Sequence, residues 1–446
     1  MTDTPTVLEC DLLVIGGGMA GLSAAGWAAE RGARVVVVER AADIGGSAFL
    51  SGGVLWTATS PGRMRLYAGG DEALAAVILS TYPTAVEWMR KREIAISPAM
   101  PVLHGRGYQI DIIAHLRGCA SMVERAAGMI ALDTETVALV IDDEGAVAGA
   151  DTAHRDGSVR ILAPHTILAT GGYQGSPEKR AERIHPNARE MRLRANPFSN
   201  GRGIELGQEV GGAIDTGNRG FYGHLVSDSR EWGLERHFTG LSQYHSEYSL
   251  LLNEAGHRFC DETMGDHCNS YHTVMQHNAR ALCFWDARIH AEHATRPVVA
   301  TAPPLDKMAL AIESGGQGIV AQQLDDVARF ADRHGFDGRQ VKATIEDYNA
   351  KARTAWERLS PGRADHCQPI DEAPFYALIV YPAITFTFGG LRVNGAAQVL
   401  REDGAPVPGL LAAGSDAGSA FGIGYAGGLA LAMTFGIVAA QTAGWR

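Results

Sequence analysis

The feature that most constrains the fold is a glycine-rich turn between two apolar segments near the N-terminus. Residues 12–15 form a short apolar run typical of a buried strand, and residues 16–21 read GGGMAG. Residues 22–31 have helical spacing, and the apolar residues 33–38 form a second strand pattern that ends before Glu39. A strand, a glycine turn, a helix and a second strand within about 30 residues are typical of a βαβ unit with a parallel sheet. The sequence therefore predicts an α/β fold.

The same glycines have the spacing of a dinucleotide-binding turn. In this pattern Gly16 permits the tight turn, Gly18 lets a pyrophosphate approach the backbone, and Gly21 lets helix and strand pack closely. The N-terminus of the helix offers N–H groups and a positive dipole to the phosphates. Glu39 follows Gly21 by 18 residues, where an acid can bind a pair of ribose hydroxyls. We expect a bound dinucleotide, with a fortuitous glycine-rich turn as the alternative.

Composition narrows the class of protein. Glycine makes up 54 of the 446 residues, about 12% against a usual value of about 7%, without the period of collagen. The net charge is -11 and no long block of Lys and Arg is present, so nucleic acid is not an expected partner. No run of about 20 apolar residues predicts a membrane span. The six cysteines form no CxxC pair and the N-terminus lacks a signal-peptide pattern, so we expect a cytoplasmic location.

Two further glycine pairs follow the second strand. Residues 45–56 read GGSAFLSGGVLW, which resembles a segment that lies along the pyrophosphate and flavin in the FAD-containing fumarate reductase and succinate dehydrogenase flavoprotein superfamily. The segment is most similar to that of the 3-ketosteroid dehydrogenase branch. Members that attach FAD covalently do so through a His in this segment. Since no His is present here, the resemblance implies non-covalent FAD.

Three segments far along the chain resemble the same superfamily. Residues 167–173, ILATGGY, resemble the element that closes over the dinucleotide, and residues 409–416, GLLAAGSD, resemble an element whose acid binds the ribityl chain. The apolar residues 426–440 predict a buried helix whose first N–H groups face the flavin pyrimidine edge. The cofactor contacts implied by all these motifs are Gly16, Gly18, Met19, Ala20, Gly21, Glu39, Arg40, Gly45, Gly46, Ser47, Ser51, Gly52, Gly53, Thr170, Gly171, Gly172, Gly414, Asp416, Gly428, Ala430 and Leu431.

Because the FAD motifs occur at both ends of the chain, the resemblance implies a discontinuous domain. We expect a Rossmann-type FAD-binding domain at residues 1–240 and 386–446, with an inserted α+β cap domain at residues 241–385 that carries substrate-binding residues. Helical patterns at residues 325–334 and 339–359 fall in the cap.

Candidate substrate contacts lie in residues 422–430, GIGYAGGLA. Fumarate reductases carry a carboxylate-clamping Arg before the last glycine pair, and Tyr425 takes its place here. Ketosteroid dehydrogenases also have a Tyr there, so the resemblance implies that the Tyr425 hydroxyl and the Leu429 N–H hold a ketone oxygen and stabilise the enolate. A carboxylate-binding His of fumarate reductases falls on Phe386. The tricarballylate dehydrogenase branch also has a Tyr in a similar loop, which keeps a carboxylate substrate open, and packing on the flavin is the alternative role for Tyr425.

A flavin that exchanges hydride with carbon also needs an acid or base. Residues 254–267, EAGHRFCDETMGDH, resemble a cap segment in which fumarate reductases place a proton-donating Arg and ketosteroid dehydrogenases a Tyr base; Asp266 stands at that position. We predict Asp266 as the base, with His267 and Tyr271 as rivals. His224 resembles a substrate-binding His of relatives, or else is structural. Further candidates are Tyr108, Tyr244 and Tyr248 as pocket walls, whereas the irregularly spaced Cys and His of residues 260–277 predict no metal site.

The leading hypothesis is an FAD-dependent dehydrogenase that desaturates the Cα–Cβ bond of a cyclic or steroid-like ketone. Electrons would pass to an external acceptor, a quinone, a soluble carrier or oxygen. The first alternative is a fumarate-reductase-like ene-reductase or dehydrogenase acting on a carboxylic acid, which requires an Arg that faces the flavin. The sequence does not place the candidates for that role, which are Arg192, Arg194, Arg258, Arg280, Arg288 and Arg392. A non-catalytic flavin-binding module is a further alternative.

Overall fold

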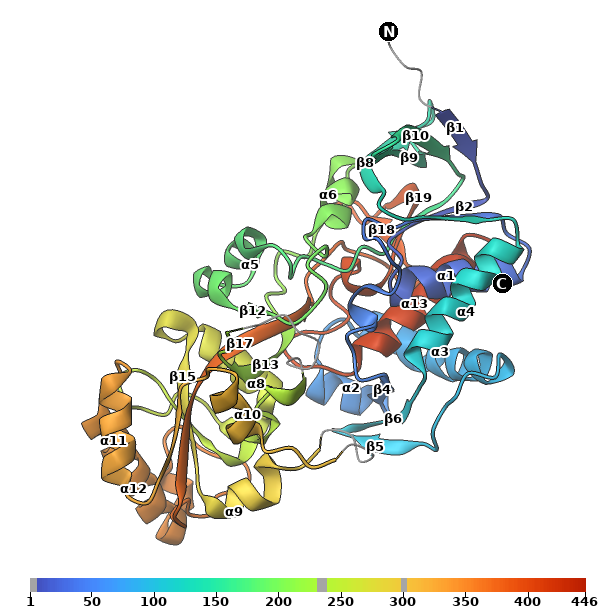
Figure 1. The fold of residues 1–446 in the computed structure, drawn as a ribbon. Coiled ribbons are helices and arrows are strands. Elements are labelled where there is room, and N and C mark those ends of the chain that lie inside the picture. Colours follow the sequence, from blue (N-terminus) through green and yellow to red (C-terminus); the bar gives the residue numbers. More distant parts are fainter. Residues whose placement is uncertain (1–5, 231–238, 298–302) are drawn as a thin grey trace. The chain divides into compact units, whose positions relative to one another are not determined.

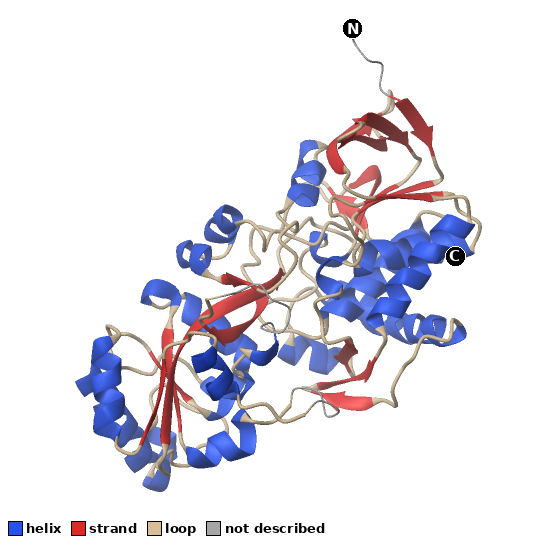
Figure 2. Ribbon diagram, in the orientation of Figure 1, coloured by secondary structure: helices blue, strands red, loops and turns tan. Residues whose placement is uncertain are grey.

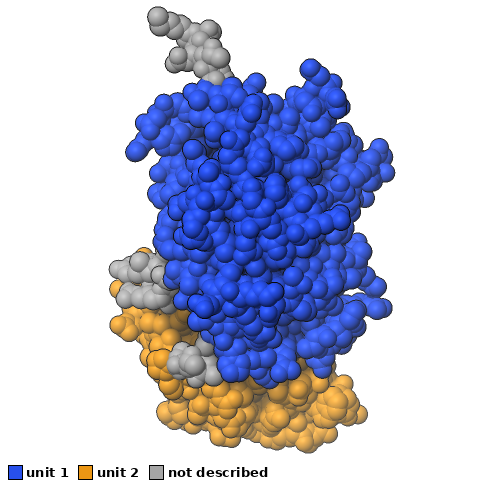
Figure 3. Space-filling model, turned by 90° about the vertical axis from the view of Figure 1, so that its right-hand side faces the viewer, with its two compact units in different colours: residues 1–179, 195–221, 386–446 blue, residues 180–194, 222–385 orange. Residues whose placement is uncertain are grey.

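The computed structural model describes residues 6–230, 239–297 and 303–446. Contacts divide the chain into two compact units (Figure 3). Unit 1 comprises Met1–Lys179, Ala195–Phe221 and Phe386–Arg446, and unit 2 comprises Arg180–Arg194 and Tyr222–Thr385. The division at residue 385 coincides with the expected domain boundary. On the N-terminal side it differs, because residues 180–194 and the described residues between 222 and 240 lie in unit 2, not with the FAD-binding motifs.

Unit 1 is built on a six-stranded sheet (Figure 1). Its strand order is β18 (Gln398–Leu400), β19 (Pro406–Ala412), β11 (Thr166–Leu168), β2 (Leu12–Ile15), β3 (Val35–Val38) and β7 (Met129–Ala131). All of these neighbours are parallel except β18 and β19. Strands β2 and β3 are apolar and fully buried, as strands of a parallel sheet covered on both faces must be. The β2–α1–β3 segment is the predicted βαβ unit.

Helices cover this sheet. Helix α1 (Met19–Glu30) packs against α4 (Ile112–Arg125) and the C-terminal α13 (Gly428–Thr442), which in turn packs against α3 (Glu72–Lys91). Helix α13 is buried along most of its length, as its apolar sequence predicts. The remaining helices of unit 1 are α2 (Pro61–Tyr67) and α6 (Arg202–Glu209). No helix of the described residues is long and apolar enough to cross a membrane.

Two smaller sheets complete unit 1. One has the strand order β1 (Thr6–Glu9), β10 (Gly157–Leu162), β9 (Val147–His154) and β8 (Glu135–Ile141). The other joins β4 (Val54–Ala58) to the hairpin of β5 (Met100–Val102) and β6 (Gly105–Gln109), with β6 in the middle. Strand β4 directly follows the glycine pairs of residues 45–53, so this small sheet begins where the expected cofactor segment ends.

Unit 2 is organised around the long strand β17 (Phe375–Thr387), whose last two residues belong to unit 1. It pairs with β12 (Arg192–Leu193), β15 (Ala281–Trp285), β13 (Phe221–Ser227) and β16 (Gly318–Ala321), and β15 pairs with β14 (Leu250–Leu252). The helices among its described residues include α5 (Pro177–Arg183), which starts in unit 1, α8 (Asp266–Val274), α9 (Ala287–Ile289), α10 (Lys307–Glu313), α11 (Leu324–Arg333) and α12 (Gly338–Thr354). Figure 2 shows the mixture of helices and strands, which confirms the predicted α/β class.

The two predicted helices of the inserted region correspond to α11 and α12. Val341, Ile345 and Tyr348 of α12 are buried in the core of unit 2, as their spacing predicts. The helix ends at Thr354 and Trp356 lies in a short 3-10 turn with an exposed side chain. The helix is therefore shorter than the predicted pattern of residues 339–359.

Candidate active site

The glycine turn after β2 contains glycines required for two different reasons. Gly16 has a φ of +111°, and a Cβ on it would lie 2.2 Å from the carbonyl oxygen of Ala169. A Cβ on Gly21 would lie 1.9 Å from the carbonyl oxygen of Gly16. Gly18 has an ordinary φ of -86°, and a Cβ on it would meet no other atom of the described chain within 4 Å. The fold explains Gly16 and Gly21, whereas the open space beside Gly18 at the N-terminus of α1 fits a pyrophosphate.

Glu39 is fixed at the end of β3, next to this turn. Its Oε2 accepts a hydrogen bond of 2.7 Å from the Gly17 N–H, and its Oε1 accepts one of 2.8 Å from the Ala41 N–H. The side chain is buried at 7% exposure. Each carboxylate oxygen can accept a second hydrogen bond, so Glu39 can still receive the hydroxyls of a ribose.

Asp416 joins two of the predicted FAD segments. Its carboxylate accepts hydrogen bonds from the Thr170 N–H, the Thr170 hydroxyl at 3.1 Å and the Gly172 N–H at 3.0 Å. Burial raises the pKa of this carboxyl above its ordinary value, although these donors oppose the shift. The acid therefore ties the 170–172 turn to the loop before α13, and its contact with a ribityl chain stays a prediction.

The serines of residues 45–53 also shape their own loop. The Ser47 hydroxyl accepts a hydrogen bond of 3.1 Å from the Asn196 N–H, and the Ser51 hydroxyl donates one of 2.7 Å to the Ala48 carbonyl. Arg40 forms an ion pair of 3.6 Å with Glu135. Helix α1 packs along α13, and its first turn meets the middle of α13, since a Cβ on Gly436 would lie 2.3 Å from the carbonyl oxygen of Ala20.

Tyr425 lies at the N-terminus of α13 in an aromatic cluster. Its hydroxyl oxygen accepts a hydrogen bond of 2.9 Å from the Gly428 N–H, and its side chain is nearly buried at 8% exposure. The ring packs edge-on against Trp56, Phe386 and Phe421. A hydroxyl whose oxygen accepts a hydrogen bond can also act as a donor, and a hydrogen-bonded chain of this kind strengthens each donor.

The loop that presents Tyr425 depends on Gly427. This residue has a φ of +95°, and a Cβ on it would lie 1.8 Å from the carbonyl oxygen of Trp56. It caps α13, whose first-turn N–H groups, Leu429 among them, have no acceptor within the helix. The Tyr425 hydroxyl therefore lies at the first turn of α13, and the roles of Tyr425 and Leu429 toward a substrate stay predictions.

His104, which sequence reasoning missed, lies against the same cluster. Its ring stacks on Tyr67 at 4.3 Å and meets Trp56 edge-on at 5.3 Å. The ring hydrogen-bonds the backbone of Tyr425, while its buried Nε2 has no hydrogen-bond partner among the described residues. Burial lowers the pKa of His104 to about 4, so the imidazole is neutral at physiological pH. A lone His in a hairpin turn carries no sequence signal for this position.

In unit 2 the structure brings together two residues predicted from separate motifs. The Nδ1 of His224, on β13, is hydrogen-bonded to Oδ2 of Asp266, the first residue of α8, and both side chains are buried. Oδ1 of Asp266 accepts hydrogen bonds from the Leu225 N–H at 3.2 Å and from the Ser246 hydroxyl at 3.4 Å. The carboxylate is therefore held by three donors, and it fixes the orientation of the imidazole.

The surroundings of His224 favour its neutral form. The rings of Tyr222 and Tyr244 lie edge-on to the imidazole, each at 4.8 Å. Burial lowers the pKa of His224, the positive charge of Arg194 lowers it further, and Asp266 opposes both effects. With Nδ1–H donated to the carboxylate, the neutral ring carries its lone pair on Nε2, which is the arrangement of a general base.

The structure also places the candidate arginines. Most of them have an acidic partner: Arg192 with Asp228, Arg258 with Glu262, Arg280 with Glu254, Arg288 with Glu292 and Arg392 with Glu402. Arg194 donates to two hydroxyls, Tyr244 Oη at 3.0 Å and Thr385 Oγ1 at 3.1 Å. Through Tyr244, whose ring meets that of His224, Arg194 contacts the surroundings of His224.

His267 and Tyr271 lie on α8 but have other neighbours. The Nε2 of His267 is 3.3 Å from the Cys268 thiol, and the Tyr271 ring meets the His272 ring. Their roles as alternative bases stay predictions.

An open glycine turn in a βαβ unit, with a buried acid at the end of the second strand, is typical of a dinucleotide-binding fold. The chain belongs to the family described as FAD binding domain, which matches residues 11–429. The predicted cofactor FAD and the predicted superfamily are thereby confirmed, and the protein is an FAD-dependent oxidoreductase that acts on CH–CH groups.

Known relatives span reductases and dehydrogenases. The chain is 26% identical to the urocanate reductase of Eggerthella lenta over 98% of this chain and 74% of the relative. It is 25% identical to the 4-oxocyclohexanecarboxylate 2-dehydrogenase of Sinomonas cyclohexanicum over 97% and 92% of the two chains. The structure of 3-ketosteroid-Δ4-(5α)-dehydrogenase from Rhodococcus jostii is similar in fold, with a TM-score of 0.77, 21% identity, and 99% and 98% of the two chains covered.

Proposed function

We propose that the protein desaturates the Cα–Cβ bond of a cyclic ketone, using non-covalently bound FAD. The observation that carries this proposal is the Tyr425 hydroxyl at the N-terminus of α13, where an Arg would be needed to clamp a carboxylate. A neutral hydroxyl donor suits a ketone oxygen, and the apolar rings around it suit an alicyclic body. The dehydrogenase from Sinomonas cyclohexanicum, whose name specifies a cyclic oxo acid, supports this substrate class.

In the proposed reaction His224 is the base, in place of Asp266. Nε2 of the neutral imidazole removes the proton from Cα, and Asp266 stabilises the imidazolium that forms. Because Asp266 already accepts from His224, the Leu225 N–H and the Ser246 hydroxyl, its role is to orient and stabilise the ring. The Tyr425 hydroxyl and the Leu429 N–H donate to the enolate oxygen as charge develops on it.

FAD, when bound, supplies the acceptor for the hydride that leaves Cβ. The products are the α,β-unsaturated ketone and two reducing equivalents. The reducing equivalents pass to an external acceptor such as a quinone, a soluble carrier or oxygen. The aromatic cluster of Trp56, Phe386 and Phe421 around Tyr425 excludes water from the donor, which strengthens its interaction with the enolate.

A second candidate is a reductase or dehydrogenase of a carboxylic acid. The observation that favours it is Arg194, whose guanidinium lowers the pKa of His224 and donates a hydrogen bond to the Tyr244 hydroxyl. An arginine beside the proton-transfer residue can bind a carboxylate in a bidentate manner. The urocanate reductase of Eggerthella lenta supports this direction of chemistry.

Anaerobic mixing of the oxidised holoenzyme with substrates separates these candidates. Flavin absorbance is followed after addition of cyclohexanone-type ketones, cyclic oxo acids, or saturated dicarboxylates. Bleaching by ketones that lack a carboxylate supports the proposal. Bleaching by dicarboxylates alone, or oxidation of the reduced enzyme by unsaturated acids alone, would overturn it in favour of the second candidate.

A further inference from the structure

A pocket in unit 1 lies between the β4–β6 pair and helix α3, on the face of the strands opposite to the aromatic cluster. Side chains alternate along a strand, so Leu55 and Thr57 point away from the side on which Trp56 meets Tyr425. In the register of the two strands Leu55 is opposite Tyr108, and Thr57 is opposite Arg106. These four side chains therefore share one face, which α3 covers.

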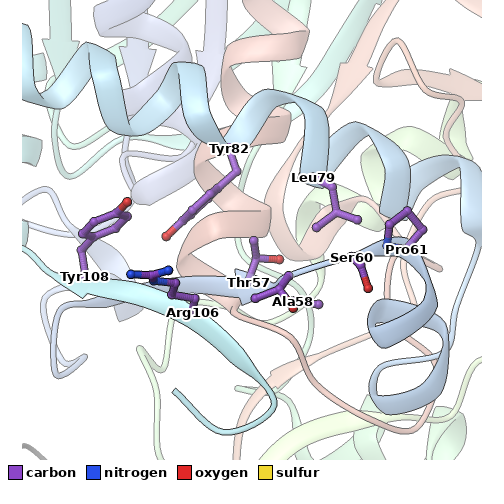
Figure 4. Close-up of a pocket in the computed structure, with 9 residues that line it drawn as sticks. Thr57, Ala58, Ser60, Pro61, Leu79, Tyr82, Arg106 and Tyr108 are labelled. Carbon is purple, nitrogen blue, oxygen red and sulfur yellow. The ribbon is translucent and has the colours of Figure 1, made fainter. Parts of the chain in front are cut away.

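The pocket on this face has a volume of about 280 Å³ (Figure 4). Tyr82 and Leu79 reach toward the strands from α3, while Arg106 and Tyr108 extend from β6. The lining is completed by the β4 residues Thr57 and Ala58 and the following residues Thr59, Ser60 and Pro61. Known small-molecule pockets begin at roughly 300 Å³, so the space suits a ligand of about one ring.

Two polar side chains of this pocket lack hydrogen-bond partners among the described residues. Thr57 is buried at 4% exposure, and its hydroxyl has no hydrogen-bond partner among the described residues. A buried hydroxyl without a partner costs about 1 to 3 kcal/mol, so such a group indicates a missing ligand or water. The guanidinium of Arg106 forms no hydrogen bond or ion pair within the described chain.

The charges around the pocket are positive although the whole chain has a net charge of -11. No acidic side chain lines it within the described chain. The guanidinium of Arg90 lies 5.3 Å from the centre of the Tyr108 ring and also lowers the pKa of Tyr82 against the effect of burial. The Tyr82 hydroxyl donates to the Leu55 carbonyl at 2.7 Å, so its oxygen remains an acceptor and its ring is fixed.

We propose that this pocket binds a small carboxylate carried on a single ring. The carboxylate accepts from Arg106 and from the Thr57 hydroxyl, and the ring packs against Leu79, Tyr82 and Tyr108. Inorganic anions would satisfy Arg106 but leave these apolar surfaces uncovered. The pocket is separate from the proposed reaction site, because the Trp56 side chain and Tyr425 lie on the opposite face of the β4–β6 pair. The proposed ligand site does not depend on the proposed function.

Titration of the FAD-loaded protein with benzoate tests this proposal by calorimetry and saturation-transfer NMR. Because Arg106 is exposed to solvent, we expect a Kd of about 0.1 to 1 mM, and benzyl alcohol should bind at least about tenfold more weakly. Arg106→Gln should weaken benzoate binding about tenfold or more, and Thr57→Val by several-fold. The matched control is Arg65→Gln, which removes an exposed Arg of α2 that is paired with Glu72 of α3. This variant should leave binding unchanged.

Three results would overturn the proposal. The first is benzoate binding that Arg106→Gln and Thr57→Val both leave unchanged, which would place benzoate elsewhere on the protein. The second is displacement of benzoate by inorganic phosphate that binds with equal affinity, which would show that the site recognises negative charge alone. The third is no binding of benzoate at 10-fold above the expected Kd range. Circular dichroism and flavin content of each variant establish that the fold is retained.

Discussion

Nδ1 of His224 donates its hydrogen bond to a carboxylate that is buried with it and that two further donors hold in place. The partner, Asp266, lies 42 residues away at the start of α8. This relationship is the basis of the proposed roles, proton transfer by the imidazole and orientation by the carboxylate. We therefore expect His224→Ala to lower kcat about 10² to 10⁴-fold with a smaller change in KM, because general bases contribute rates of that order. Stopped-flow measurement of flavin reduction checks this.

The control for this experiment is the content of bound FAD, which His224→Ala and Asp266→Asn should both retain. Asp266→Asn should also lower the rate, because an amide can donate to Nδ1 and shift the ring proton to Nε2. Ser246→Ala removes one of the three donors and should cost at most about tenfold. A His224→Ala enzyme with a normal rate would transfer the role of base to another residue, such as His267 or Tyr271.

The two charges beside His224 predict opposite shifts of the pH profile. Protonation of the base inactivates it, so kcat should fall as the pH drops through the pKa of His224, which lies below its ordinary value. Asp266 raises this pKa and Arg194 lowers it. Asp266→Asn should therefore move the acid limb to lower pH, and Arg194→Gln should move it to higher pH. Profiles of the rate of flavin reduction from pH 4 to 9 measure both shifts.

The matched control for Arg194→Gln is Arg192→Gln, since Arg192 lies two residues earlier in the chain and is paired with Asp228. That variant should leave the acid limb in place. Shifts of the same sign in the Asp266 and Arg194 variants would contradict His224 as the group that titrates.

Tyr425→Phe should lower kcat about 10² to 10³-fold, because loss of one donor to a developing oxyanion has this effect in other enzymes. The substitution also leaves the Gly428 N–H without its acceptor. Tyr376→Phe, which removes a hydroxyl from β17 in unit 2, serves as the matched control. Rates and flavin spectra are compared with a ketone substrate. An unchanged rate in Tyr425→Phe would leave Tyr425 as a packing residue.

The motifs of unit 1 are local in the sequence, whereas the proposed base depends on tertiary contacts. Gly16, Gly18 and Gly21 lie within one turn, and Tyr425 and Leu429 lie within one helix start, so the spacing along the chain determines how they meet. Backbone requirements of this kind can be read from sequence because no distant residue has to be known.

The pairing of His224 with Asp266 depends on how β13 and α8 pack, which no spacing reveals. For the same reason the sequence left Arg194 unplaced and gave no indication of His104, whose position follows from stacking between Tyr67 and Trp56. Asp266 was predicted as the base from its position in a motif. Its three donors, which became visible only in the fold, are the basis for proposing a supporting role instead.

Two fully buried histidines predict acid instability. Burial lowers the pKa of His115 and of His245 to about 3, against about 6.5 in an unfolded chain. The folded state therefore binds fewer protons, so the stability that these residues contribute is complete above pH 6.5 and is lost as the pH falls toward 3. Each should add about 1.4 kcal/mol per pH unit to the slope in this range.

His245→Phe tests this dependence. Both ring nitrogens of His245 lack hydrogen-bond partners among the described residues and its ring packs on Trp285, so Phe can replace it with little loss of packing. Urea unfolding at pH 4 to 7 should give a flatter slope for the variant than for the natural protein. An unchanged slope would show that His245 is already protonated in the folded state.

The glycines of the phosphate turn predict a separation of folding from cofactor binding. Gly18→Ala introduces a methyl group into open space at an ordinary φ, so the apoprotein should fold with a thermal midpoint close to that of the natural protein. The same methyl group would occupy the approach of the pyrophosphate, and the affinity for FAD should fall about tenfold or more. Gly21→Ala would instead collide with the Gly16 carbonyl at 1.9 Å, so the fold itself should be destabilised by several kcal/mol, at least about 2. Thermal unfolding of the apoproteins, together with FAD titration followed by flavin fluorescence, distinguishes the two effects. Normal FAD binding by Gly18→Ala would show that the pyrophosphate does not lie at this turn.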